Sequence, residues 1–161
     1  QMCIRDRTYE NEVDFEPLLE ERFVAACRRD HPLAAKSKIT WKQLSKYDFI
    51  SVSKSSGNRL LMDQALAGIK DTPQSMYETR HGTTMIGLVE AGLGVAVVPS
   101  LTMPGADHPL LVSVPLIDPV VTRKMGLIKR RSSVLNPAAQ QLYDLCTELR
   151  ARRPSAQRKS L

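Results

Sequence analysis

Residues 88–99 have the sequence LVEAGLGVAVVP, and this stretch decides the predicted fold. Its first half continues an apolar helical pattern and stops near Gly92, since glycine readily adopts the left-handed backbone that ends helices. Its second half, residues 94–99, is a continuous apolar run, too short for a helix and rich in β-branched residues. Such a strand is normally buried on both faces of a parallel sheet. We therefore predict a helix, a glycine turn and a buried strand here.

The chain before this stretch alternates between strand and helix patterns. Short runs that are apolar or alternate in polarity predict strands at residues 23–27, 47–52 and 76–80. Thr40 is a suitable cap for a short helix at residues 41–44. Apolar residues at helical spacing predict further helices at residues 61–69, with Gly68 as a C-terminal stop, and at residues 85–91.

The chain after this stretch continues the alternation. Further strands are predicted at residues 110–114 and 124–129, on either side of Pro115 and Pro119. Asn136 is a good N-cap and Pro137 suits the first position of a last helix. That helix carries one apolar stripe: Ala138, Ala139, Leu142, Leu145, Cys146 and Leu149. Strands that alternate with helices predict an α/β protein.

Composition places the chain among folded, water-soluble proteins, with 42% hydrophobic and 25% charged residues. Cys3, Cys27 and Cys146 are an odd number without close pairing, so they suggest neither a disulfide framework nor a zinc knuckle. We therefore expect a reducing, cytoplasmic location. No apolar stretch approaches the roughly 20 residues of a membrane span, and the first residues form no apolar signal-peptide core. A membrane partner is not expected.

The net charge of +6 comes mainly from one end of the chain. The last residues contain Arg150, Arg152, Arg153, Arg158 and Lys159 and no acid. Removing these five from the 23 basic residues leaves 18, against 17 acidic ones. Because the body is then nearly neutral, we interpret the end as a solvated basic tail rather than a DNA-binding arm.

Two polar turns are the candidate binding sites. The first comprises Ser53, Lys54, Ser55, Ser56 and Gly57, and the second contains Thr83 and Thr84; each lies between a predicted strand and a predicted helix. Ligands of α/β sheets gather at the carboxyl ends of strands, where helix N-termini present free N–H groups and partial positive charge. A small anion suits such turns. The alternatives are that Ser56 or Asn58 only caps its helix, and that a threonine caps the next one.

No residue pattern indicates catalysis or a metal. Cys27 and His31 provide two potential ligands, too few for a zinc site. No segment has the form of a nucleophile elbow or supplies a nucleophile, a base and an oxyanion site together. Glu78 could orient a polar group, although an exposed strand carboxylate is the simpler interpretation. We expect no catalytic residue, no metal and no cofactor.

From about Leu18 to Arg152 the chain resembles the effector-binding (substrate-binding) domain of LysR-type transcriptional regulators. Four segments in order carry the resemblance: RDHPLA at residues 29–34 with WKQL at 41–44, the polar turn and helix at 53–68, residues 88–99, and the strand, basic turn and helix at 123–152. Each segment alone is weak, because a glycine-ended helix before a strand is common. Their order and spacing together are specific.

The resemblance implies an α/β fold of the periplasmic-binding-protein type II-like kind, with lobe II complete and only the C-terminal part of lobe I. Residues 1–17 are then an unassigned segment with a remnant of lobe I, and 18–120 are regulatory lobe II with its hinge strand. Residues 121–152 are the returning part of lobe I, and 153–161 the basic tail. The family places effector contacts at the positions of Lys54, Ser55 and Ser56, in the cleft between lobes.

The resemblance also implies a helix-turn-helix domain on the N-terminal side of residue 1 in the full-length regulator. Promoter DNA is then a partner only through that missing N-terminal domain, and the full-length protein is a homodimer or homotetramer. With lobe I incomplete, we expect lobe II to fold, the C-terminal piece to be mobile or to borrow a partner, and effector binding to be weak. The alternatives are a transporter's solute-binding protein, which shares this fold, and a hydrolase or transferase on an α/β scaffold.

Overall fold

The computed structural model describes residues 12–152, which form two compact units. One unit comprises residues 12–21 and 123–152, and the other is Arg22–Thr122. The predicted basic tail, 153–161, and most of the unassigned segment 1–17 lie outside the described residues. Within 12–152, no helix is both long and apolar enough to cross a membrane.

The strand predicted at residues 23–27 is the end of a much longer one. Strand β1 is Val13–Arg28, 16 residues. Its first half was missed because Pro17 and several acidic residues interrupt the apolar pattern, and most of it is only half-buried. The fully buried part, from Phe23 to Cys27 with only Val24 half-buried, is the part that the apolar run predicts.

The sheet has the order β2-β6-β1-β5-β3-β4, and β7 pairs with β1 outside this path. The bounds are Ile39–Thr40 for β2, Phe49–Val52 for β3, Ser75–Thr79 for β4, Val95–Pro99 for β5, Leu111–Ile117 for β6 and Thr122–Arg130 for β7. Strand β3 runs parallel to β4 and to β5, but β5 runs antiparallel to β1. The full burial predicted for β5 is therefore confirmed, whereas its all-parallel surroundings are wrong.

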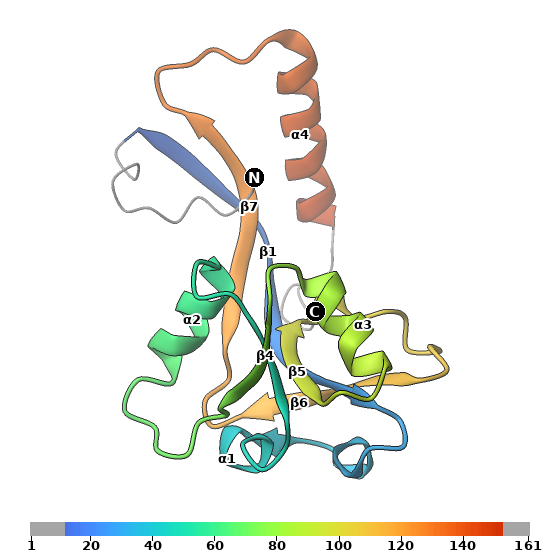
Figure 1. Cartoon of the computed structure of the whole chain (residues 1–161). Helices are drawn as coiled ribbons and strands as arrows, with labels where there is room; N and C mark the ends of the chain where they lie inside the picture. The colour runs from blue at the N-terminus through green and yellow to red at the C-terminus, as the bar shows by residue number, and fades with distance from the viewer. Residues whose placement is uncertain (1–11, 153–161) are drawn as a thin grey trace. The chain divides into compact units, whose positions relative to one another are not determined.

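Helices cover both faces of this sheet in the second unit. The bounds are Trp41–Leu44 for α1, Gly57–Ala65 for α2 and Gly82–Glu90 for α3. Figure 1 shows α2 and α3 on opposite sides of β4 and β5. The predicted cap of α1 is confirmed, because the Thr40 hydroxyl accepts the N–H of Gln43 (3.2 Å) and the Gln43 side chain accepts the N–H of Thr40 (3.0 Å).

Two helices begin earlier than predicted, and the first of them also ends earlier. Helix α2 begins at Gly57 and ends at Ala65, so Gly68, with a φ of 88°, lies in the following turn. Helix α3 begins at Gly82, three residues before the predicted start at Met85. Polar first-turn residues hide such starts, because they carry no apolar period.

In residues 88–99, the stretch on which the predicted fold rests, the two glycines have positive φ angles. Helix α3 ends with Gly92 at a φ of 81°, and the N–H of Leu93 donates to the carbonyl of Leu88 (3.1 Å), as in a Schellman motif. Gly94 has a φ of 147°, and a Cβ there would collide with the carbonyl oxygen of Asp48. Glycine is therefore required at both positions, for conformation at the first and for space at the second.

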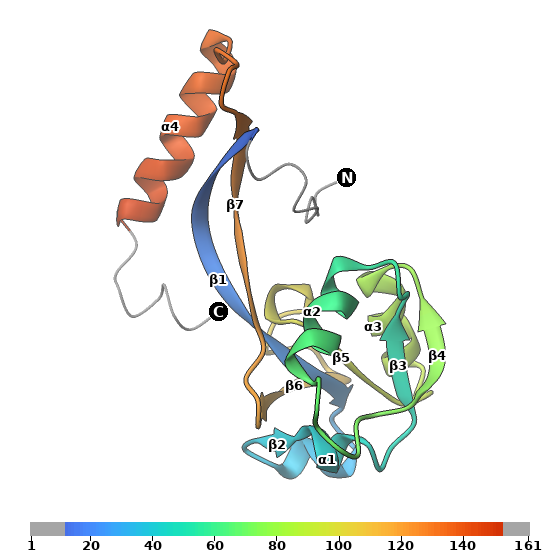
Figure 2. The same cartoon turned by 90° about the vertical axis from the view of Figure 1, so that its left-hand side faces the viewer.

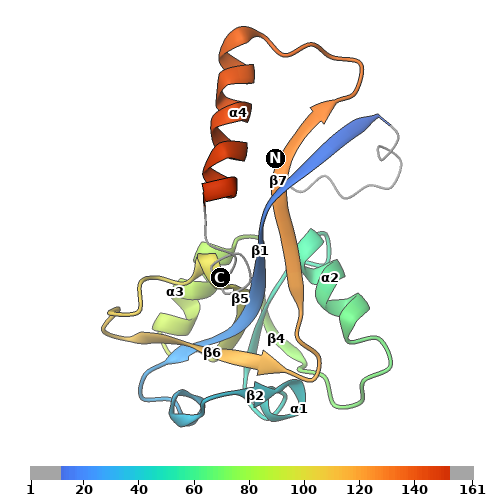
Figure 3. The same ribbon diagram turned by 180° about the vertical axis from the view of Figure 1, so that it is seen from behind.

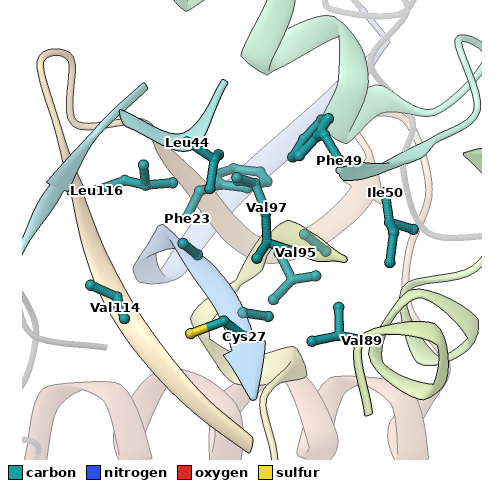
Figure 4. Close-up of a cluster of buried hydrophobic side chains, with 14 of the residues drawn as sticks. Phe23, Cys27, Leu44, Phe49, Ile50, Val89, Val95, Val97, Val114 and Leu116 are labelled. Carbon is teal, nitrogen blue, oxygen red and sulfur yellow. The ribbon is translucent and has the colours of Figure 1, made fainter. Parts of the chain in front are cut away.

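The core of the second unit is one cluster of buried side chains on both faces of β3 and β5. Figure 4 shows several of them, among which Ile50 and Val89 come from β3 and α3. Trp41 of α1 is 1% exposed, and its indole N–H donates to the carbonyl of Pro119 (3.0 Å). This bond fixes α1 against the segment between β6 and β7; β2, directly before α1, pairs with β6 (Figure 3).

The first unit consists of the beginning of β1, strand β7 and helix α4, Pro137–Arg152. Figure 2 shows β7 running beside β1. The predicted cap of α4 is confirmed, because the Asn136 side chain accepts the N–H of Ala139 (2.8 Å). No residue of α4 is buried, and Leu142 and Leu145 are 61% and 54% exposed. The apolar stripe is thus uncovered in this part of the chain; whether it is mobile or borrows a partner stays a prediction.

Candidate functional site

The two predicted turns lie at the same edge of the sheet. The first follows β3 and the second follows β4, and these parallel strands pair Val52 with Thr79 at their carboxyl ends. The N–H of Ser53 donates to the carbonyl of Thr79 (2.7 Å), which ties the beginnings of the two turns together. The topology therefore brings both candidate sites to the edge where α/β sheets bind ligands.

The hydroxyl groups of the first turn bond largely to one another. The hydroxyls of Ser53 and Ser55 are 3.1 Å apart, and the N–H of Ser56 donates to the carbonyl of Ser53 (2.8 Å). Ser56 is the N-cap of α2, since its hydroxyl accepts the N–H of Asn58 (3.3 Å). Lys54 and Ser55 are exposed to solvent. The capping alternative is thus confirmed for Ser56, whereas Lys54 and Ser55 are accessible to a ligand.

Neither threonine of the second turn caps its helix. The N-cap of α3 is His81, whose side chain makes no capping hydrogen bond, and Gly82 is the first helical residue. Thr83 and Thr84 are therefore the second and third residues of α3, and both are exposed. The threonine-cap alternative is wrong because the helix begins earlier than its apolar pattern does. The first-turn N–H groups of α3 are consequently not satisfied by a side-chain cap.

A cavity of about 330 Å³ lies at this edge, between the first turns of α2 and α3. Its volume is at the lower end of the range for small-molecule sites. The lining residues are Val52, Asn58, His81, Gly82, Thr83, Met85, Val97, Val98, Pro99 and Thr102. Of the predicted residues, Thr83 lies in this lining, whereas Thr84 and the turn from Ser53 to Gly57 do not.

Sequence reasoning missed most of the lining residues. Asn58 directly follows the first predicted turn and His81 is the first residue of the second, so the turn pattern itself was a signal for both. Val97 to Pro99 are the carboxyl end of β5, which the strand pattern locates but does not identify as a binding wall. Thr102, just beyond, had no signal, because its position depends on how the chain turns after Pro99.

The charges around the cavity favour an anion. Helices α2 and α3, each 9 residues long, both begin beside it and present the positive ends of their dipoles. The basic side chains of Lys54 and Arg80 are exposed in or next to the two turns. Glu78 is exposed on β4, as the simpler interpretation expected. Two helix N-termini with nearby cations can hold a carboxylate or another small anion through charge-assisted hydrogen bonds.

Fold and cavity together define an α/β domain of the periplasmic-binding-protein type II-like class. The family model of the LysR substrate binding domain matches residues 2–151. The chain belongs to this family of transcriptional-regulator domains, which confirms the resemblance drawn from the sequence. Its curated relatives YbhD and YfeR are regulators, so the solute-binding alternative is not favoured.

The chain matches only part of the length of each of these two relatives. The chain is 48% identical over 140 residues to the "Uncharacterized HTH-type transcriptional regulator YbhD" of Escherichia coli (strain K12), covering 85% of this chain and 43% of that protein. It is 34% identical over 130 residues to "Uncharacterized HTH-type transcriptional regulator YfeR" of Shigella flexneri, covering 81% and 42%. The chain thus spans less than half the length of the relatives it matches.

Solved structures share the fold. The effector binding domain of QuiR, in complex with shikimate, matches with a TM-score of 0.77 at 23% identity, over 94% of this chain and 70% of that chain. The regulatory domain of CcmR from Synechocystis PCC6803, in complex with 2-PG, matches with a TM-score of 0.77 at 23% identity, over 89% and 70%. At this identity the likeness establishes the fold, and the predicted fold class is confirmed.

Proposed function

We propose that this chain is the effector-sensing part of a LysR-family transcriptional regulator and that it binds a small anionic metabolite in the 330 Å³ cavity. One observation carries the proposal: the first turn of α3 borders the cavity, and its N–H groups have no side-chain cap. An anion at this position would accept those N–H donors, and the Thr83 hydroxyl could add another. Each charge-assisted hydrogen bond stabilises a complex by about 1.5–3 kcal/mol.

Other residues complete this site, within the lining and beside it. Asn58 and His81 contribute polar groups to the cavity wall. We propose that Ser53, Lys54, Ser55, Ser56 and Gly57 form its rim and that Thr84 flanks it. The ligands of the two matched structures, shikimate and 2-PG, are small molecules, and shikimate carries a carboxylate. A carboxylate is therefore the first class of effector to test.

The whole regulator would work by relaying effector binding to DNA. We propose that residues 18–120 are regulatory lobe II and that 121–152 are the returning part of lobe I, whose remainder belongs to a further segment of the regulator. Promoter DNA would be contacted through a separate helix-turn-helix domain, in a cytoplasmic homodimer or homotetramer. The support is membership of a family of HTH-type regulators. On the same ground the chain is proposed to sense rather than to catalyse.

The experiment is a thermal-shift screen with small carboxylates, sugar acids and amino acids, run on this chain and on the full-length regulator. At a ligand concentration of 100 Kd, binding adds about 2.7 kcal/mol of stability, which raises the Tm by roughly 5–10 °C. Thr83→Val removes a lining hydroxyl, and Thr84→Val is the matched control on the next residue. Ser55→Ala with Ser56→Ala tests the rim.

The proposal expects a stabilising carboxylate whose effect falls in Thr83→Val by more than in Thr84→Val. A hit that neither Thr83→Val nor the serine double variant weakens would place the effector elsewhere. If the full-length regulator binds none of the carboxylates, the anionic class is wrong.

A further inference from the structure

A second cavity, of about 180 Å³, lies within the Arg22–Thr122 unit between α1, β3, α2 and the segment after α2. Its walls combine apolar side chains with an ion pair and a buried hydroxyl. The residues that give it this character are Trp41, Phe49, Ser51, Arg59, Met62 and Asp63. Its volume is below the range of about 300–1,000 Å³ that drug-sized ligands occupy, so it suits a smaller molecule.

This cavity is separate from the candidate effector site. Successive side chains of a strand point to opposite faces of the sheet. Phe49 and Ser51 line the second cavity, and Val52, the next residue of β3, lines the first. The two cavities share no lining residue and lie on opposite faces of β3. Helix α2 borders the second cavity through Arg59, Met62 and Asp63.

The polar end of the second cavity is an ordered group of three side chains. Arg59 Nη1 donates to the hydroxyl of Ser51 (2.9 Å), and Arg59 Nε donates to the carboxylate of Asp63 (2.7 Å). Ser51 is fully buried, whereas the side chains of Arg59 and Asp63 are 24% and 54% exposed. A guanidinium has five N–H donors, so these two bonds leave donors at the Nη end. The second carboxylate oxygen of Asp63 can likewise accept from a ligand.

The apolar part of the lining is deeply buried. Trp41 and Met62 are 1% and 3% exposed, and Phe49 is 6% exposed. All three belong to the buried hydrophobic core, so they offer a ligand an apolar surface. A ligand of this cavity therefore needs an apolar part and a compact charged part. The charged part of the ligand must fit beside both the Arg59 guanidinium and the Asp63 carboxylate, which already form an ion pair.

We propose that this cavity binds an α-amino acid with an apolar side chain. The ligand carboxylate accepts the free Nη donors of Arg59, its ammonium donates to Asp63, and its side chain packs against Trp41 and Met62. A simple carboxylate would bring its charge close to Asp63, and a simple amine would bring its charge close to Arg59. A zwitterion matches both charges and leaves the Arg59–Asp63 pair intact. The inference is independent of the effector proposed for the first cavity.

Tryptophan fluorescence can test this directly, because Trp41 is the only tryptophan of the chain and it lines the cavity. L-leucine is the probe, and titration is followed by Trp41 emission and by calorimetry. Two isosteric comparators, 4-methylpentanoate and 3-methylbutylamine, each lack one charged group. The expected result is saturable binding of L-leucine, with each comparator at least about tenfold weaker, since each loses one charge-assisted hydrogen-bonded pair.

Variants locate the binding without depending on the comparators. Asp63→Asn and Arg59→Gln should each weaken L-leucine binding by about tenfold or more. Glu148→Gln is the matched control, because Glu148 and Arg152 form another i,i+4 ion pair, on α4. Thr83→Val, in the first cavity, should leave L-leucine binding unchanged. Circular dichroism checks that each variant is folded.

Three outcomes would overturn the inference. The first is that L-leucine, L-methionine and L-phenylalanine all fail to bind the wild-type chain at millimolar concentration. The second is that L-leucine binds but Asp63→Asn has no more effect than Glu148→Gln. The third concerns the first cavity. Loss of L-leucine binding in Thr83→Val alone would move the amino acid to the first cavity. That result would refute the second site and leave the proposed function standing.

Discussion

The ion pair between Glu21 and Arg123 allows a sharp test of what holds the two long strands together. These residues are the last of the first unit on β1 and the first of that unit on β7. Glu21 is fully buried, and Arg123 Nε and Nη2 lie 2.6 and 2.5 Å from its Oε1. The perturbation is Arg123→Met, which keeps most of the side-chain volume but removes the guanidinium.

The expected cost follows from the burial of the carboxylate. Removal of one partner of a buried ion pair costs about 3–5 kcal/mol, because the remaining charge has lost its countercharge in a medium of low dielectric constant. With an m-value of about 2 kcal/mol per molar urea, the midpoint of unfolding should fall by roughly 1.5–2.5 M. Replacing both residues, Glu21→Leu with Arg123→Met, should recover most of this loss, because a buried ion pair gains little over apolar residues of similar volume.

The assay is urea unfolding followed by circular dichroism at 222 nm for the wild type, both single variants and the double variant. This double-mutant cycle isolates the coupling between the two side chains. A loss below about 1 kcal/mol in Arg123→Met would refute the reasoning. A double variant no more stable than Arg123→Met would also refute it, since the penalty would then come from packing rather than from the buried charge.

Three further predictions concern single residues. Burial raises the pKa of the Cys27 thiol to about 11, so at pH 8 only about one molecule in a thousand carries the reactive thiolate. Mass spectrometry should therefore find Cys27 labelled by a disulfide reagent only after the chain is unfolded. Gly94→Ala should destabilise the chain by at least about 1–3 kcal/mol, because the new Cβ would collide with the carbonyl of Asp48 and the backbone has a positive φ. The control Gly87→Ala has open space around the new Cβ inside α3 and should stabilise the chain by about 0.5–1 kcal/mol. Equal urea midpoints for the two variants would contradict both expectations. Burial lowers the pKa of His31 from 6.5, so the neutral imidazole stabilises the fold fully above pH 6.5, and this stability is lost as the pH falls through the lower folded pKa. His31→Asn keeps an N-cap acceptor but cannot titrate. Its urea midpoint should therefore fall less than that of the wild type between pH 7 and pH 5.

Secondary structure was predictable wherever burial left a regular pattern. Strands β3 and β5 and the cap of α1 match because fully buried runs and capping residues are local signals. The first half of β1 was missed because its pattern is mixed and interrupted by Pro17. The early start of α3 was missed for a related reason: its first turn, Gly82 to Thr84, is polar and open to solvent.

The candidate site was predictable as a place but not as a set of residues. The order strand, polar turn, helix identified the two turns, and the parallel pairing of β3 with β4 places them at one edge. The lining of the cavity depends on side chains from β5 and from Thr102, which are distant in sequence from both turns. Which hydroxyls bond within the turn, as Ser53 does with Ser55, is also decided only by the folded backbone.

The sequence by itself determined the class of this protein: an α/β domain of the LysR substrate-binding family, with a glycine turn at residues 92–94 and two polar turns, each after a predicted strand. These features are local, because periodicity, caps and glycines act over a few residues. Only the tertiary structure decided that β5 lies between a parallel and an antiparallel neighbour, and that Glu21 is neutralised by Arg123. Only the tertiary structure places Arg59 between Ser51 and Asp63 beside Trp41. These arrangements join residues from different elements, and no short-range pattern in a single sequence records such contacts.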